Sequence, residues 1–373
     1  MAHAYTPGLR VTELAVLRRE RRLPLRGKVL VTQGDAVEAD QVVARCELPG
    51  NVQTLNVASR LSIDPVKVPD SLTRPVGSTV ARGDVVASGK SLFGLVTNTV
   101  TAPTDGVIES VSHITGQLLF REPPIPVEVT AFVRGRVQAV LPEEGVVVET
   151  RAALLQGIFG VGGETWGPIA VAVNGPAEEL TAARLTAAHR GCVVVGGSYV
   201  SHAALMRARE IGVSAVVVGG FDDHDLRLLL GRDLGVAITG SEDLGFTLVL
   251  TEGFGRITMA ERTWKLLRLY DGQRASVSGA TQIRAGVMRP EILIPHAASD
   301  LEVPNTADRG LEVGSLLRVI RQPYFGRIGH AVELPAELQA LESEARVRVV
   351  EVEFADDHTR AVVPRANVEL IAE

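Results

Sequence analysis

Cysteine is almost absent from this sequence. Only Cys46 and Cys192 occur in 373 residues, too few for a four-cysteine zinc site or iron–sulfur cluster, and no disulfide framework is indicated. Long apolar runs are missing as well, since none reaches the roughly 18 residues that a membrane span requires. The first residues lack the apolar segment of a signal peptide. These absences predict a cytoplasmic protein without a membrane span.

Basic residues are also fewer than acidic residues. The net charge is −6 at pH 7, from 38 lysines and arginines against 44 acids, which argues against a general nucleic-acid binder. Hydrophobic residues make up 46% of the chain and charged residues 22%, as in an ordinary globular protein. The length is sufficient for two or three domains, each with its own core.

The basic residues that are present gather near the N-terminus. Residues 10–28 contain seven basic residues against two acids, which favours a contact with an anion or a partner, or a solvated arm or helix face. We predict a basic N-terminal arm over residues 1–23. Four arginines stand almost side by side in it: Arg18, Arg19, Arg21 and Arg22.

Between residues 24 and 155 short β-branched segments alternate with glycine turns, a pattern that predicts a compact β domain. Residues 56–73 interrupt it with Asp64-Pro65 and read as a small helical insertion. Four pieces of similar sequence begin at Gly27, Val76, Ala102 and Gly135.

This domain resembles the barrel-sandwich hybrid of biotinyl and lipoyl carrier domains, on the strength of the turn Ala102-Pro103-Thr104-Asp105-Gly106. The resemblance places the carrier lysine at position 95, where this chain has Leu95. We therefore expect the carrier fold without covalent biotin or lipoate.

A glycine cluster at residues 157–163 follows the β domain. A β domain followed by such a cluster is similar to the flavin- and NADH-binding subunits of the RnfC type and of complex I, over residues 10–180. Their approaching lysine and their iron–sulfur cysteines have no counterpart here. We interpret the cluster as a structural turn and leave the identity of any cofactor open.

Residues 156–289 show apolar runs that end in glycine and acid, separated by segments of helical period. This alternation predicts an α/β, Rossmann-like domain with a parallel sheet over residues 169–280, and helices over 178–190 and from Ser201 to Ile211. The whole chain is therefore predicted to be an α/β multidomain protein.

The carboxyl ends of parallel strands share one edge, where ligands usually bind. We predict a crevice at this edge that binds a small phosphorylated or carboxylated ligand, because glycine N–H groups and helix N-termini attract anions. The loops after Gly196, Gly219, Gly240, Thr251 and Gly279 should share it. The candidate ligand-binding residues are Gly196, Gly197, Ser198, Ser201, His202, Gly219, Gly220, Asp222, Asp223, Glu242, Asp243 and Glu252.

Alternatives remain for these polar residues. Asp and Ser at strand-to-helix turns also cap helices, and paired acids with His202 or His224 could hold a divalent metal or perform acid–base chemistry. No metal site is assigned, because no known metal-binding or nucleophile motif is present.

Residues 290–310 contain three prolines and predict a linker, and residues 311–373 predict an SH3-like β barrel. The second segment resembles the KOW motif of NusG-type factors, which implies binding to RNA, ribosome or polymerase. Its seven arginines and eleven acids give a net charge of −4, which favours a protein partner because phosphate neutralisation drives nucleic-acid affinity. The matching residues are Gly314, Val319, Pro323, Phe325, Gly326 and Gly329.

These features favour a non-catalytic scaffold or accessory protein that docks partners through β modules and binds a small anionic ligand or a subunit on its α/β domain. One alternative is an enzyme or sensor that uses a nucleotide, flavin or metal at the strand edge. The other is a transcription- or translation-associated factor, which rests on the KOW resemblance alone.

Overall fold

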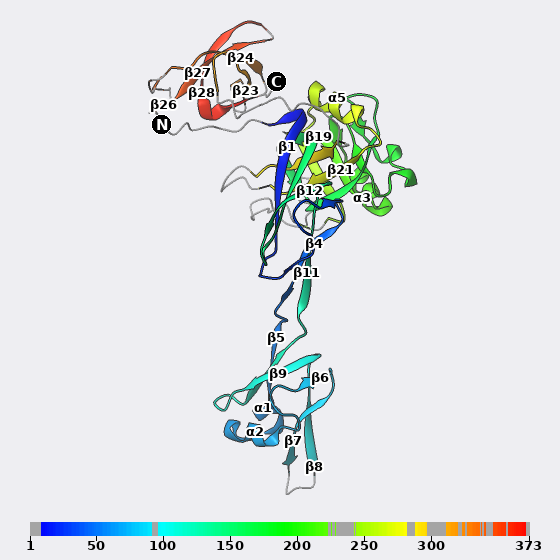
Figure 1. Cartoon of the computed structure of the whole chain (residues 1–373), viewed down its shortest axis with the longest axis vertical. Coiled ribbons are helices and arrows are strands. Elements are labelled where there is room, and N and C mark those ends of the chain that lie inside the picture. The colour runs from blue at the N-terminus through cyan, green and yellow to red at the C-terminus, as the bar shows by residue number, and fades with distance from the viewer. Residues whose placement is uncertain are drawn as a thin grey trace.

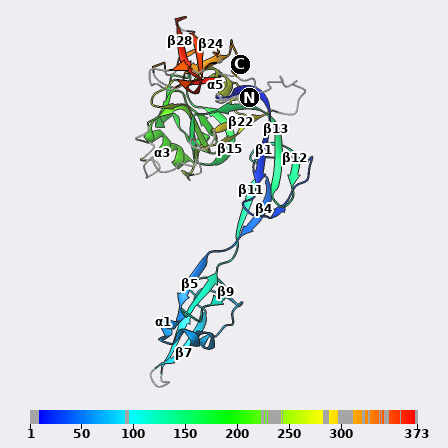
Figure 2. The same ribbon diagram turned by 90° about the vertical axis from the view of Figure 1, so that its left-hand side faces the viewer.

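The computed structural model describes residues 9–91, 96–222, 225, 228, 242, 244–281, 288–296, 311–319, 323–324, 327–335, 337, 339–340, 346–355 and 357–370. The described chain is mostly β, with a mixed sheet and a half-barrel sheet. Figures 1 and 2 show a head, a narrow stalk with a distal lobe at its far end, and a C-terminal module beside the head. No helix in these ranges is long and apolar enough to cross a membrane.

One sheet of the head contains eleven strands, ten in a continuous order and the eleventh, β1, paired with β13 outside this order. The strands are, in sheet order, β14 (Phe159–Val161), β20 (Thr247–Phe254), β19 (Ala215–Phe221), β17 (Val193–Val195), β15 (Glu164–Val171), β21 (Arg274–Ser278), β22 (Glu291–Pro295), β13 (Gly145–Gln156), β12 (Gly135–Leu141) and β3 (Ala36–Val37), with β1 (Val11–Arg22) on β13.

The middle of this sheet is parallel and its margins are not. β15, β17, β19 and β20 run parallel, and their valine-rich runs are buried because protein covers both faces. β14 pairs antiparallel with β20, and β21 pairs antiparallel with β15. The prediction of a parallel sheet throughout residues 169–280 is therefore wrong at β21, whereas β14 precedes the predicted range. Gly272, with φ of 80°, turns the chain directly back into β21.

Two helices pack on the parallel strands. α3 (His202–Ile211) begins at its N-cap Ser201, as the sequence predicted, and buries Leu205 and Ala208 in the core of the head. α5 (Glu261–Leu269) buries Trp264 and Leu267 in the same core.

The helix predicted over residues 178–190 is absent. Glu179–Leu180 forms β16 instead, parallel to β18 (Tyr199–Val200), and two short 3-10 helices follow at Ala182–Arg184 and Ala187–His189. The extended backbone places Leu180 at 0% exposure in the core, and this burial outweighs the local helical pattern.

The linker predicted over residues 290–310 is wrong at its start. β22 lies between β21 and β13, with Ile292, Leu293 and Ile294 fully buried. Pro290 lies just before this strand and Pro295 is its last residue, and at these positions they do not interrupt its pairing. Residues 297–310 lie outside the described residues.

The prediction of a basic N-terminal arm over residues 1–23 is also wrong for residues 11–22. Residues 11–22 form β1, which pairs with β13 along almost its whole length. The four arginines contact carboxylates of the protein itself: Arg18 pairs with Glu149, Arg19 with Glu291, Arg21 with Glu164, and Arg22 with Glu20 and Glu144.

The stalk and the distal lobe are made from residues 28–130, except for β3, which belongs to the sheet of the head. β2 (Lys28–Val29), β4 (Val42–Leu48) and β11 (Ile125–Thr130) form the stalk sheet. The lobe contains the sheet β5 (Val52–Asn56), β10 (Gln117–Arg121), β9 (Gly106–Val111) and β6 (Thr79–Val80), the hairpin β7 (Val85–Ser91) and β8 (Val96–Thr101), the helices α1 (Val57–Leu61) and α2 (Val68–Ser71), and a 3-10 turn at Pro65–Lys67.

The structure differs here from the single compact β domain expected over residues 24–155. One hydrophobic core lies entirely between Leu55 and Phe120, inside the lobe, and a separate core contains Val43, Phe132 and Val148. The lobe is thus inserted in the chain between β4 and β11, on a narrow connection (Figure 1). The helices lie within the predicted insertion 56–73, and Leu95 lies outside the described residues.

The C-terminal module is a curved antiparallel sheet in the order β28 (Arg360–Pro364), β27 (Val349–Phe354), β24 (Ile328–Glu333), β23 (Leu316–Val319) and β29 (Val368–Leu370). A short pair, β25 (Gln339–Ala340) and β26 (Arg346–Val347), adjoins it in sequence. Its own small core contains Leu317, Val352 and Phe354. Phe325 and Gly326 of the predicted KOW match are outside the described residues.

Because the lobe has its own core, we expect it to unfold separately from the head. Phe120→Ala should destabilise the lobe by about 3–5 kcal/mol, since a fully buried ring is lost. Hydrogen exchange read by mass spectrometry should then accelerate in β9 and β10 but not in β13 or β19. The matched variant Phe132→Ala, in the core next to the stalk, should accelerate exchange in β13 but not in β9 or β10. Acceleration in all regions by either variant would contradict two independent cores.

Candidate functional site

The predicted ligand edge lies at the carboxyl ends of β17 and β19. Gly196, Gly197 and Ser198 follow β17 directly, and Asp222 follows β19. Gly219 and Gly220 are within β19, and Glu252 is within β20, so these three begin no loop. Asp223, His224, Gly240 and Asp243 lie outside the described residues.

The glycines at this edge allow close approach of the chain's own backbone. A Cβ atom on Gly197, Gly219 or Gly220 would overlap the carbonyl oxygens of Glu178, Ile257 or Gly255 respectively. The N–H of Gly219 donates to the Gly197 carbonyl at 2.7 Å, and the N–H of Gly196 donates to that of Val217 at 2.9 Å. These two N–H groups, predicted to be open to an anion, are hydrogen-bonded within the protein.

The serines at the edge are also used locally. Ser198 donates through its hydroxyl to the Ala177 carbonyl at 2.8 Å and through its N–H to the Glu178 carbonyl at 3.0 Å. Ser201 accepts the N–H of Ala204 at 3.3 Å and so caps α3, which confirms the capping interpretation for this residue. His202 is the first residue of α3 and is partly exposed.

A charged cluster that the sequence analysis missed stands beside this edge. The guanidinium of Arg256 lies 4.2 Å from the centroid of the Tyr199 ring and forms an ion pair with Glu179 at 2.5 Å. Burial raises the pKa of the Tyr199 hydroxyl, and the charges of Asp225 and Asp222 raise it further. The cluster joins residues of β16, β18 and the loop after β20. These residues are far apart in the sequence, so no local sequence pattern indicates their contact.

Glu252 forms a structural contact. Its side chain is 6% exposed, and one carboxylate oxygen accepts the N–H of Ala260 at 2.9 Å, where α5 begins. The other oxygen accepts Arg318 Nη1 of β23 at 2.7 Å. The carboxylate predicted to bind a ligand therefore connects the head to the C-terminal module.

Gly279 lies at the opposite edge from the one predicted. It follows the antiparallel strand β21, donates its N–H to the Gly163 carbonyl at 2.7 Å, and lies against Thr247 at the start of β20. Only a parallel β21 would have brought the loop after it to the predicted crevice. Gln282, beyond it, is outside the described residues, and Glu242 is partly buried.

Among the described residues, no group of three or more histidine, cysteine, aspartate and glutamate side chains is placed to hold a metal ion. Both cysteines are buried and free, and burial raises the pKa of the Cys192 thiol, which keeps it in the unreactive form. The predicted edge brings Ser198, Ser201, His202 and Asp222 into one region, but Ser198 is hydrogen-bonded within a turn and Ser201 caps a helix.

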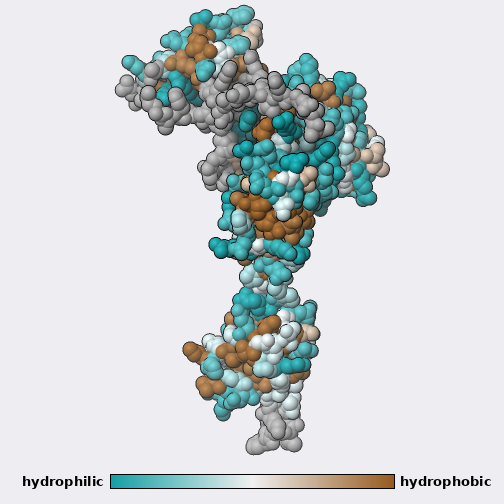
Figure 3. Space-filling model, in the orientation of Figure 1, coloured by the Kyte–Doolittle hydropathy of each residue, from teal (hydrophilic) through white to brown (hydrophobic). Residues whose placement is uncertain are grey.

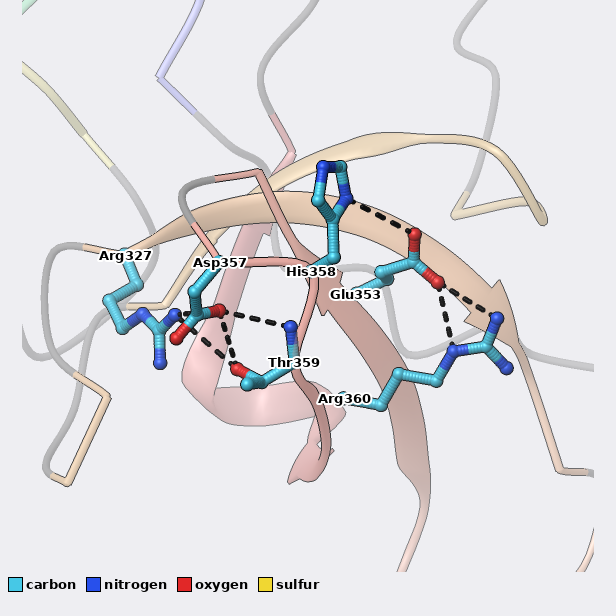
Figure 4. Close-up of polar contacts among 6 residues, drawn as sticks. All are labelled: Arg327, Glu353, Asp357, His358, Thr359 and Arg360. Carbon is cyan, nitrogen blue, oxygen red and sulfur yellow. Dashed lines mark hydrogen bonds and ion pairs between the residues drawn. The ribbon is translucent and has the colours of Figure 1, made fainter.

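An exposed polar network lies in the C-terminal module, in the hairpin between β27 and β28 (Figure 4). Asp357 accepts the Thr359 hydroxyl at 2.6 Å, the Thr359 N–H at 3.0 Å and Arg327 Nη2 at 2.6 Å. Glu353 on β27 accepts Arg360 Nε at 2.9 Å. These bonds hold a turn in which His358 has a positive φ of 56°.

Comparisons with known proteins identify no relative of this chain, so the site is interpreted from its geometry alone. No protein-family model matches the chain, and a search of curated proteins finds no match.

The Glu252–Arg318 contact predicts a measurable connection between head and C-terminal module. Arg318→Met should leave the buried carboxylate without its guanidinium and cost about 3 kcal/mol, seen as faster hydrogen exchange in β23. Arg360→Met, which breaks the more exposed pair with Glu353, should cost about 0–1 kcal/mol. The double variant Glu252→Leu/Arg318→Met should recover part of the loss. Equal effects of the two single variants would refute the role of Glu252.

The hairpin network makes a pH prediction. The Thr359 hydroxyl first, then the Thr359 N–H and Arg327, lower the pKa of Asp357 from 3.8 to about 2. A lowered folded-state pKa means that the carboxylate stabilises the hairpin above about pH 4 and loses this effect as the pH falls from 3.8 to about 2. Thr359→Val should raise the pKa of Asp357 toward 3.8 in a carboxyl NMR titration. An ordinary Asp357 pKa in the unaltered protein would count against the network.

Proposed function

We propose that this protein is a non-catalytic scaffold that presents its distal lobe, at the end of the stalk, to a partner protein. The observation that carries the proposal is the separate core of the lobe, together with the narrow connection that holds it beyond the head (Figure 2). A lobe of this kind adds a second binding surface at a distance from the head, which a single compact domain does not offer.

We also propose a fold assignment for each part of the chain. The lobe and stalk correspond to the barrel-sandwich hybrid expected from the carrier-domain resemblance, without covalent biotin or lipoate. The parallel part of the head corresponds to the Rossmann-like domain, and the C-terminal module to a KOW-like SH3 barrel. The hairpin β7–β8, the curved five-stranded sheet and the run β15, β17, β19, β20 support these assignments.

A role for the C-terminal module in binding a protein, and not RNA, is favoured by its charge. Its acids outnumber its arginines by four, and Arg327 and Arg360 pair with Asp357 and Glu353 within the module. Arginines engaged in this way add little attraction for phosphate.

The scaffold proposal predicts that partners contact the lobe. A photo-cross-linking amino acid at Ile114, which is 89% exposed on the lobe, should give one defined protein adduct in the cells that produce the chain. The same amino acid at Leu269, which is 66% exposed on the head, serves as the control and should not give this adduct. Adducts from position 269 alone would show that partners bind elsewhere.

A second candidate function is binding of a small anion at the edge of the parallel strands. It is favoured by one feature, the start of the ten-residue helix α3, where Ser201 is the cap and His202 is partly exposed in the first turn. Titration calorimetry with inorganic phosphate, acetate and nucleotides should detect binding that His202→Ala weakens and His189→Ala does not. No heat with any of these anions would exclude this function.

A further inference from the structure

A groove lies where the distal lobe meets the stalk. It encloses about 610 Å³, the largest of the three principal cavities among the described residues. Its walls are mostly apolar, from Pro49, Val80, Ala81, Val107, Pro123 and Pro124. We call it the neck groove. Figure 3 shows hydrophobic residues gathered on the surface of the lobe.

The apolar surface continues from the groove across the outer face of the lobe sheet. Val52, Arg121, Val107 and Thr79 are paired in one row across β5, β10, β9 and β6. Side chains alternate between the two faces of a sheet, and Phe120, next to Arg121, points into the core. The row therefore points outward, and its two valines are 43% and 37% exposed.

The charge of the groove is negative. Arg121 lines it but is neutralised by Glu109 at 2.7 Å. Asp105 accepts the backbone N–H of Arg82 at 2.7 Å, and Glu122 accepts hydrogen bonds from the neutral side chains of Asn51, Gln53 and Thr104. Among the described residues, neither carboxylate forms an ion pair, so two negative charges remain beside an apolar wall.

The edge of the lobe sheet adjoins this groove. β6 is the last strand of its sheet, and among the described strands it pairs with β9 alone. Its residues Thr79 and Val80 line the groove. A strand edge beside apolar pockets is the arrangement that binds an extended peptide through main-chain hydrogen bonds and alternate side chains.

We propose that the neck groove binds an extended segment of a partner protein, with apolar side chains against Val107 and the prolines and a lysine or arginine facing Asp105 and Glu122. This inference rests on the proposed scaffold function and names the surface and the partner chemistry for it. The two carboxylates repel phosphate, so nucleic acid and anionic lipid do not fit this surface.

The test selects displayed random peptides of about ten residues on the immobilised full-length protein. The recovered peptides should share alternating apolar residues and a basic residue, and a fluorescent copy should bind in anisotropy measurements. Val107→Lys should weaken its binding about ten-fold or more, because it removes an apolar contact and repels the basic residue. Asp105→Asn, which retains the acceptor for the Arg82 N–H, should weaken binding severalfold.

Matched controls lie on the same lobe away from the groove. Val66→Lys, at a position that is 67% exposed, and Asp70→Asn on α2 should leave peptide affinity unchanged. Failure to recover any peptide, recovery of peptides without a basic residue, or equal binding to Val107→Lys would overturn the proposal.

The cross-linking experiment separates this inference from the scaffold function. If position 114 still gives its adduct in the Val107→Lys background, the lobe binds its partner and the groove is not the contact. Loss of the adduct in that background but not with Val66→Lys supports both proposals. No adduct in either background overturns the scaffold function itself.

Discussion

The rest of the molecule depends on the pairing of one long strand, β13. Its twelve residues pair with β1 on one side and with β12 and then β22 on the other. Toward its end the two faces of β13 belong to different cores, with Ala152 and Leu154 in the core next to the stalk and Ala153 and Leu155 in the core of the head. One strand thus fixes the stalk to the parallel sheet, because a change of its register would exchange the residues of both cores.

The charges near β1 reinforce this joint. Arg19 reaches Glu291 on β22, and Arg21 makes two parallel bonds of 2.7 Å to Glu164 on β15 while its guanidinium lies 5.4 Å from the ring of Phe132. A planar guanidinium suits such a shared position better than a lysine ammonium does. The basic stretch that indicated a partner contact therefore connects strands within the head.

The sequence predicted strands well where buried runs were continuous, as at Val193–Val195 and Ala215–Phe221, and it predicted the cap at Ser201. It failed where long-range pairing decides the outcome: Glu291–Pro295 became a central strand, and Leu180 is buried in an extended segment. At the site the sequence identified the end of β17 but placed the ends of β19 and β20 too early. It also gave no sign that the glycines meet backbone, because glycines that meet a ligand have the same local pattern. Glu252 illustrates this limit, since its partner Arg318 is 66 residues away.

The proposed scaffold presents a surface at a distance, so the lobe must stand apart from the head. It would lose this role if the lobe folded back onto the head. The stalk sheet is three strands wide, and the lobe and the head share no core residue. Small-angle X-ray scattering of the full chain in solution tests this most directly. The account predicts a pair-distance distribution with a main peak from the head and a long tail from the lobe. A single symmetric peak without the tail would contradict it.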